Sequence, residues 1–116
     1  MYKRQYDEAV KNVFNALDKV EEKLNSNNYL IGNQLTEADI RLVTTLLRFD
    51  NVYHYHFKCN LKKISDYKKL SRYLEKFKKL DCIKRTTFND HIKRHYFLSH
   101  ESINPTRIIP IGPIIL

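Results

Sequence analysis

Apolar residues recur at helical spacing in the first quarter of the chain. Between about Asp7 and Asn25 they return every three or four residues, and charged residues occupy the positions between them. This periodicity predicts an amphipathic helix that ends in the polar run from Asn25 to Asn28. The stripe expected to face the core consists of Val10, Val13, Leu17, Val20 and Leu24.

A second helix start is recognisable in the hexapeptide LTEADI, residues 35–40. The Thr36 hydroxyl can cap the helix, Asp39 can bond back to the Thr36 backbone, and Leu35 can pack on Ile40. The next residues are apolar on more than one side of a helix, which is typical of a helix in the centre of its domain. They are Ile40, Leu42, Val43, Leu46, Leu47 and Phe49.

The second half of the chain repeats this pattern less regularly. A third helix is expected over about 65–80 and a fourth from Asn89 or Asp90 through HIKRHYFLSH, whereas residues 50–64 are irregular. All three prolines lie within INPTRIIPIGP, which predicts an extended arm. The sequence therefore predicts an all-α fold: one domain over residues 1–116, a bundle of four to five helices with an extended C-terminal arm.

Composition narrows this picture. Two glycines and three prolines in 116 residues disfavour a turn-rich β-sandwich or barrel. No apolar run approaches the ~18–20 residues that cross a bilayer. Two cysteines, Cys59 and Cys82, are too few for a disulfide framework, and the charged N-terminus does not resemble a signal peptide. We expect a cytoplasmic protein.

The charge of +8 is concentrated in the second half, where residues 51–116 carry 14 basic and 5 acidic side chains. Such asymmetry can mark a surface for nucleic acid or anionic lipid. The lysines alternate with acidic residues and no nucleic-acid-binding motif is present, so this function is disfavoured.

Candidate reactive residues are scattered. His91 and His95 are four apart, and His54 and His56 lie near Cys59, but neither set has the spacing of a known metal site. Lysines surround Cys59, although an inert, packed thiol is the more common state. From its residues alone, the chain is a small helical domain without a complete active site.

Five sequence blocks occur in an order that changes this interpretation: TEADIRLVTTLLRFD, VYHYHFKCN, ISDY, DHIKRHYFLSH and INPTRIIPIGP. Together they resemble the C-terminal helical domain of the xi-class glutathione transferases, the glutathionyl-hydroquinone reductases. The resemblance implies glutathione as co-substrate, a glutathionyl-hydroquinone as substrate and a homodimer at full length. It also implies a thioredoxin-like N-terminal domain that carries the nucleophilic cysteine. By motif match, Tyr53 and Tyr96 approach that sulfur, favour its thiolate and line the quinone pocket.

The chain also departs from the family pattern. Neither cysteine precedes a proline, Tyr6 does not match the family's proton-donating tyrosine, and Arg107 stands where the family usually has glycine. With no thioredoxin-like half in this sequence, we expect the chain alone to be inactive. Two other functions stay open: a stand-alone protein-interaction module, or a domain that binds RNA or an anionic surface.

Overall fold

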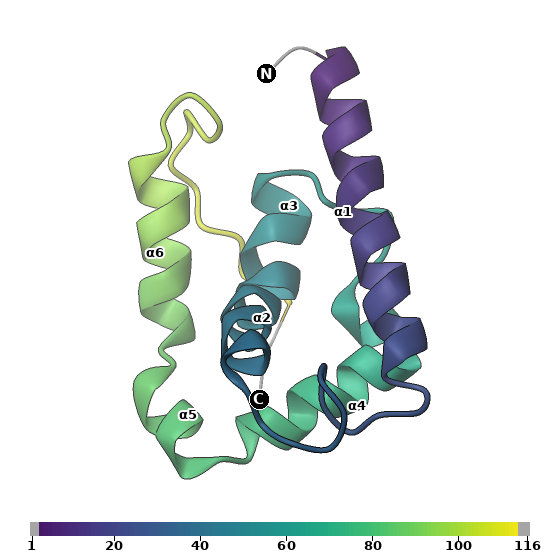
Figure 1. Cartoon of the computed structure of the whole chain (residues 1–116). Helices are drawn as coiled ribbons and strands as arrows, with labels where there is room; N and C mark the ends of the chain where they lie inside the picture. Colours follow the sequence, from purple (N-terminus) through teal and green to yellow (C-terminus); the bar gives the residue numbers. More distant parts are fainter. Residues whose placement is uncertain (1–2, 114–116) are drawn as a thin grey trace.

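The computed structural model describes residues 3–113, and every regular element among them is helical (Figure 1). The prediction of an all-α bundle with an extended arm is confirmed. No helix in this part of the chain is long and apolar enough to cross a membrane. The elements are α1 (Lys3–Lys23), α2 (Glu37–Arg48), the π-helix η1 (Phe49–Tyr53), α3 (His54–His56), the 3-10 turn η2 (Ile64–Asp66), α4 (Lys68–Lys78), α5 (Asp81–Thr86) and α6 (Asn89–Ser99).

The buried stripe of α1 differs by one position from the prediction. Val13 is 36% exposed, whereas Phe14 is 5% exposed and its ring packs edge-to-face on Phe49, with centroids 5.9 Å apart. The aromatic ring at position 14 reaches the core, and the β-branched Val13 lines a surface pocket beside it. The core stripe is therefore Val10, Phe14, Leu17 and Leu24, and the predicted Val20 is partly buried and packs against it.

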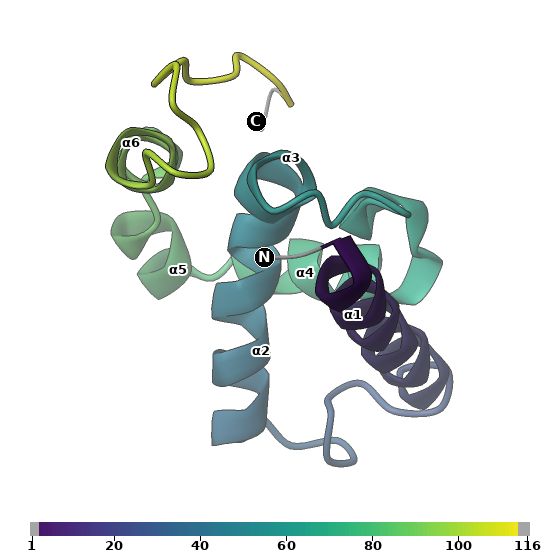
Figure 2. The same ribbon diagram turned by 90° about the horizontal axis from the view of Figure 1, so that it is seen from above.

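Helix α2 runs through the middle of the molecule, with α1 on one side and α5 and α6 on the other (Figure 2). Val43 and Leu46 are almost fully buried and belong to the same core cluster as α1 and α4. The prediction of a central helix is correct for this face. Leu35 and Ile40, expected to pack on each other, are 52% and 43% exposed, so polar contacts hold the start of α2 instead.

Those polar contacts converge on Asp39, which is 0% exposed. Its carboxylate accepts hydrogen bonds from the Thr36 backbone (3.0 Å), the Thr36 hydroxyl (3.4 Å), the Leu30 backbone (3.0 Å) and the Tyr73 hydroxyl (2.7 Å). The predicted capping box is therefore present. Through Tyr73 and Leu30, the Asp39 carboxylate also connects α2 to α4 and to the loop that precedes α2.

Helix α4 begins later than predicted, because residues 64–66 form the separate turn η2. Its N-terminus is capped from another helix: both carboxylate oxygens of Glu21 on α1 accept backbone N–H groups, from Lys69 and Leu70, at 2.7 Å each. The expectation of irregular structure over 50–64 was wrong up to His56, since η1 and α3 continue α2 as helix. Helix α5 was not predicted.

The C-terminal arm folds back beside α6. The Lys93 ammonium donates to three successive carbonyls, those of Pro110, Ile111 and Gly112, at 3.0–3.1 Å. The Asn104 side chain donates to Phe97 O and Ile108 O, at 2.9 and 3.0 Å. These contacts order a segment whose prolines exclude a regular helix.

Arg107 occupies the left-handed region of the backbone, with φ of 57°. That geometry explains why a glycine suits this position, because a Cβ there costs about 1–2 kcal/mol. Glycine also gives the unfolded chain more freedom, which offsets about 0.5–1 kcal/mol. We therefore expect Arg107→Gly to raise the free energy of unfolding by up to about 1 kcal/mol in urea denaturation. Arg107→Lys, which keeps the Cβ and the charge, should give no gain; equal stability of the two variants would contradict this.

Candidate functional site

Helix α2, the π-helix η1 and α3 form one continuous helical segment, and this segment places Tyr53 against α6. Residue 53 is the last of a five-residue π-turn, a geometry found frequently at functional sites. Within this turn Asn51 and Val52 are buried, and Tyr53 is only partly exposed. The π-turn thus directs consecutive side chains into the core and toward the neighbouring helix.

Tyr53 and Tyr96, which the sequence motifs nominate as functional, lie in direct contact. Their hydroxyl oxygens are 3.2 Å apart, and their rings meet edge-to-face with centroids 5.7 Å apart. Phe49 and Phe57 pack on the other sides of Tyr53, with centroids 6.2 and 5.6 Å away. The structure therefore brings together two residues 43 positions apart in the chain.

The environment keeps Tyr53 protonated. Burial, and then the hydrogen bond with Tyr96, raise the pKa of Tyr53 to about 12. The two tyrosine hydroxyls carry two O–H groups, of which their mutual hydrogen bond uses one. The second is available to an acceptor outside the pair. A hydrogen bond donated to an anion favours its charged form, so the pair can stabilise a thiolate or phenolate placed beside it.

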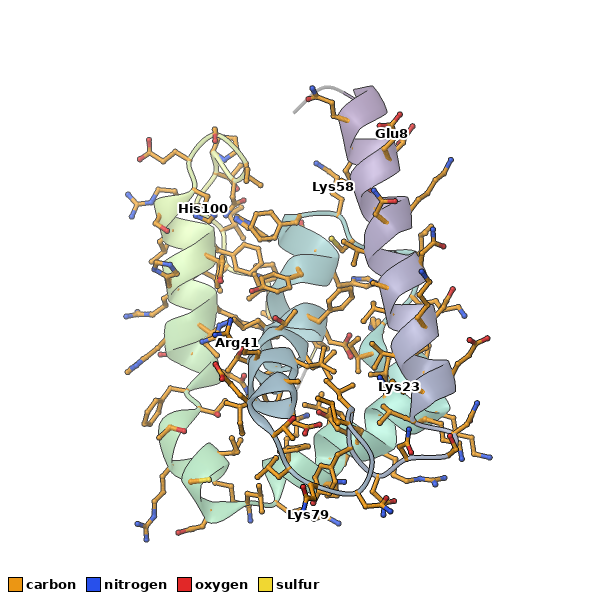
Figure 3. All side chains as sticks on the ribbon, in the orientation of Figure 1. Glu8, Lys23, Arg41, Lys58, Lys79 and His100 are labelled. Atoms are coloured by element: carbon orange, nitrogen blue, oxygen red, sulfur yellow. The ribbon has the colours of Figure 1, made fainter. Side chains whose placement is uncertain are left out.

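A pocket of about 630 Å³ opens next to the tyrosine pair, between α1, the end of α3 and the start of the arm. Its walls include Tyr6 and Val13 of α1, Phe57–Cys59 and Ile103. Tyr6 donates a hydrogen bond to the Lys58 carbonyl and closes one side. Figure 3 shows Lys58 on the side of α3 that faces α1. Tyr53 and Tyr96 do not line this pocket; Phe57, which packs on both, lies between.

The other candidate groups have structural surroundings. Burial raises the pKa of the Cys59 thiol, so little thiolate is present at neutral pH. Cys82 is exposed on α5. His91 stacks on Phe88, with centroids 5.3 Å apart. Over residues 3–113, no three His, Cys, Asp or Glu side chains are grouped so that they could hold a metal ion.

Sequence reasoning missed two further contacts between η1–α3 and α6. Asn51 Nδ2 donates to Asn89 Oδ1 at 3.0 Å, and His56 Nε2 lies 2.9 Å from His100 Nδ1. The partners are 38 and 44 residues apart, so no local spacing could signal either contact. By its sequence spacing, His56 is only a weak candidate for a metal ligand.

Comparison with known protein families assigns this helical domain to a class. Residues 4–76 match the family model described as "Glutathione S-transferase, C-terminal domain". The match spans more than half of the chain, so the chain belongs to that family.

The similar curated proteins belong to one kind of enzyme within this family. The chain is 56% identical over 108 residues to the glutathionyl-hydroquinone reductase YqjG of Escherichia coli, covering 93% of this chain and 33% of that protein. It is 50% identical over 108 residues to the glutathionyl-hydroquinone reductase PcpF of Sphingobium chlorophenolicum, covering 93% of this chain and 34% of that protein. The chain therefore spans about a third of the length of these relatives.

Solved structures show the same relationship in three dimensions. The glutathione-bound structure of E. coli YqjG superposes with a TM-score of 0.96 at 52% identity, covering 99% of this chain and 37% of that one. The glutathione transferase Xi from Phanerochaete chrysosporium superposes with a TM-score of 0.95 at 51% identity, covering 98% of this chain and 37% of that one. The predicted resemblance to the xi-class C-terminal domain is confirmed.

Proposed function

We propose that this chain is the helical domain of a glutathionyl-hydroquinone reductase, in which Tyr53 and Tyr96 stabilise the thiolate of a cysteine outside residues 1–116. The contact between the two phenols, at 3.2 Å, is the observation that supports this role. Burial and the Tyr96 hydroxyl raise the pKa of Tyr53 to about 12, so Tyr53 is protonated at the pH at which a thiolate forms. A protonated phenol can donate to the sulfur anion and lower the pKa of the thiol.

The proposed reaction transfers a glutathionyl group from a ring carbon to the cysteine sulfur and then to a second glutathione. The cysteine thiolate attacks the sulfur of a glutathionyl-hydroquinone, forming a disulfide with glutathione and breaking the bond between sulfur and the ring. The ring carbon takes the electron pair and a proton, so the hydroquinone leaves reduced. The thiolate of a second glutathione then attacks the mixed disulfide, releases oxidised glutathione and regenerates the cysteine thiolate.

Residues 1–116 alone are proposed to lack this activity. Neither cysteine has the family's Cys-Pro motif, and burial raises the pKa of the Cys59 thiol, which opposes a nucleophilic role. Glutathione and the nucleophile are expected to be held by a thioredoxin-like partner domain. Apolar side chains on the arm are exposed to an extent that suits such a partner: Ile103 (44%), Ile108 (67%) and Ile111 (88%). Dimerisation stays a prediction.

A chimera tests this proposal. Residues 1–116 would replace the matching segment of the E. coli reductase, and turnover of a glutathionyl-hydroquinone and the thiol pKa would be measured. We expect an active chimera in which Tyr53→Phe or Tyr96→Phe raises the thiol pKa by about one unit, equivalent to about 1.4 kcal/mol. Turnover should fall about tenfold or more.

Tyr55→Phe is the matched control. This tyrosine lies on α3, two residues after Tyr53, and its side chain is 65% exposed. Its thiol pKa and turnover should equal those of the unmodified chimera. If Tyr55→Phe and Tyr96→Phe changed the thiol pKa and turnover equally, the proposed role of the tyrosine pair in stabilising the thiolate would be wrong. Turnover by residues 1–116 alone would overturn the assignment of the nucleophile to another part of the protein.

A further inference from the structure

Three polar pairs of identical residues join η1–α3 to α6 and to His100, the residue that follows α6. In each pair one residue comes from the segment 51–56 and the other from 89–100, with contact distances of 2.9–3.2 Å. Polar contacts between packed helices depend on geometry, so they specify how one helix sits on another more sharply than apolar packing does. The pairs are Asn51–Asn89, Tyr53–Tyr96 and His56–His100.

The histidine pair lies one helical turn beyond the tyrosine pair on both helices. His56 is three residues after Tyr53, and His100 is four residues after Tyr96, and these spacings place side chains on one face. The His100 ring also approaches Tyr96 itself, with centroids 5.7 Å apart. Figure 3 shows His100 at the end of α6 where the arm begins. A change in the histidine contact therefore acts directly on the position of Tyr96.

His56 sits in an aromatic box. Its side chain is 3% exposed, and its ring lies 4.7 Å from Phe97 and 4.8 Å from Phe57, measured between centroids. The His100 ring is nearly parallel to it, with an interplanar angle of 23°. His56 Nδ1 is buried without a hydrogen-bond partner, so the single proton of the neutral ring is best placed on Nε2, where it can be donated to His100 Nδ1.

This hydrogen bond requires one ring nitrogen to be free of a proton. When both rings are protonated, two N–H groups face each other at 2.9 Å and two positive charges share one buried site. We propose that His56 and His100 are positioning residues whose hydrogen bond fixes Tyr96 against Tyr53, and that protonation of both rings releases it. The effect on thiolate stabilisation rests on the proposed function, whereas the effect on the position of Tyr96 does not.

The surroundings do not compensate the positive charge. Other titratable groups near the pair are His95 and Tyr96 on α6, Tyr53 before α3, and Lys58 and Cys59 after it, with Tyr6 of α1 across the pocket and Glu101 next to His100 in sequence. Among residues 3–113, no carboxylate forms a hydrogen bond or ion pair with either histidine.

The direction of the pH effect follows from this environment. Burial, and then the charge of His100, lower the pKa of His56 below its ordinary value of 6.5. The unfolded chain therefore takes up a proton at a higher pH than the folded chain does. The contribution of the neutral His56 ring to the free energy of unfolding is fully present above its ordinary pKa. It is lost as the pH falls below that value toward the lowered pKa of the folded chain.

The test uses the 116-residue chain and reports on the tyrosines rather than on activity. His100→Ala removes the bond, and we expect the pKa of Tyr53, followed by alkaline absorbance and ring NMR signals, to drop from about 12 toward the ordinary 10.0. His100→Asn places an amide near the position of Nδ1, and His56→Gln places one near Nε2. Both variants should keep the Tyr53 pKa near that of the unmodified chain.

The same spectra recorded in mild acid test the release. The Tyr53 and Tyr96 signals of the unmodified chain should shift together below pH about 6.5 and return when the pH is raised. His100→Asn and His56→Gln should abolish this transition, because the amide oxygen can accept a hydrogen bond from the remaining histidine even when that ring is protonated. His91→Asn, at an exposed position on α6, should retain it.

Two results would overturn the proposal: an acid transition that persists in both amide variants, or a Tyr53 pKa that His100→Ala leaves unchanged. If His100→Ala does not fold, the two amide variants decide the question alone. An inactive chimera would contradict the proposed function and leave these spectra unaffected, so the two failures are distinguishable.

Discussion

Replacing Asp39 with asparagine is expected to lower the free energy of unfolding by about 3 kcal/mol or more. Asp39 is 0% exposed and its carboxylate accepts four hydrogen bonds, from Leu30, Thr36 (two) and Tyr73. Asparagine keeps the shape but presents an NH₂ group to some of these donors. Each hydrogen bond to a charged group contributes about 1.5–3 kcal/mol, so the loss of two accounts for this value. Urea denaturation at neutral pH measures it.

The pH dependence gives a second, independent check on Asp39. Burial by itself raises the pKa of this carboxyl, but the hydrogen bonds from Leu30, Tyr73 and Thr36 together outweigh burial and hold the pKa below 3.8. Since the folded-state pKa is lowered, the stabilisation is present above the ordinary pKa and is lost as the pH falls through the lowered value. Asp39→Asn should remove this part of the acid sensitivity.

Glu37→Gln is the matched control for Asp39. Glu37 lies in the same first turn of α2, but it is 77% exposed and pairs only with Arg41 on the surface. Such a pair contributes about 0–1 kcal/mol. If Glu37→Gln and Asp39→Asn had equal effects, the helix dipole rather than the buried hydrogen bonds would explain the loss.

Phe97→Ala is expected to cost about 3–5 kcal/mol, the usual range for truncating a fully buried phenylalanine. Phe97 is 0% exposed and is the buried residue of α6; its ring lies 4.7 Å from His56 and 6.0 Å from Tyr55, between centroids. Because this ring anchors α6 on α3, the variant should also weaken the Tyr53–Tyr96 contact. Urea denaturation measures the total loss, and amide hydrogen exchange should show the largest change in α6.

Phe88→Ala tests whether the loss comes from burial. Phe88 immediately precedes α6 and is 55% exposed, so its truncation removes far less buried surface and should cost under about 1 kcal/mol. Uniform loss of amide protection throughout the molecule in Phe97→Ala would show that α6 does not unfold separately. That result would contradict the role of Phe97 as a local anchor.

Local signals predicted the helices well where the cause was local. The periodicity of α1 and the capping box of α2 act over three or four residues, and both elements appear near their expected bounds. The same reasoning failed at Val13 and Phe14, because only the position of Phe49 decides which of the two adjacent residues packs. It also failed at the start of α4, whose cap is Glu21 from another helix.

The candidate site shows the same division. Family resemblance nominated Tyr53 and Tyr96 from their motifs, while the physical pattern of the chain left them indistinguishable from core tyrosines. The structure adds their contact and the histidine pair behind it. It also shows that the pocket of about 630 Å³ lies beside the tyrosines and is not lined by them.

By itself, the sequence determined that this chain is helical, where α2 and α6 begin, and that its prolines lie in an extended arm. These properties depend on neighbours a few residues apart, whose side chains meet whatever the rest of the chain does. Only the tertiary structure decided that α6 lies on η1–α3 and that Asn51, Tyr53 and His56 each meet an identical residue there. Those contacts join positions 38 to 44 residues apart, and they depend on a π-turn and on helix packing that no local pattern specifies.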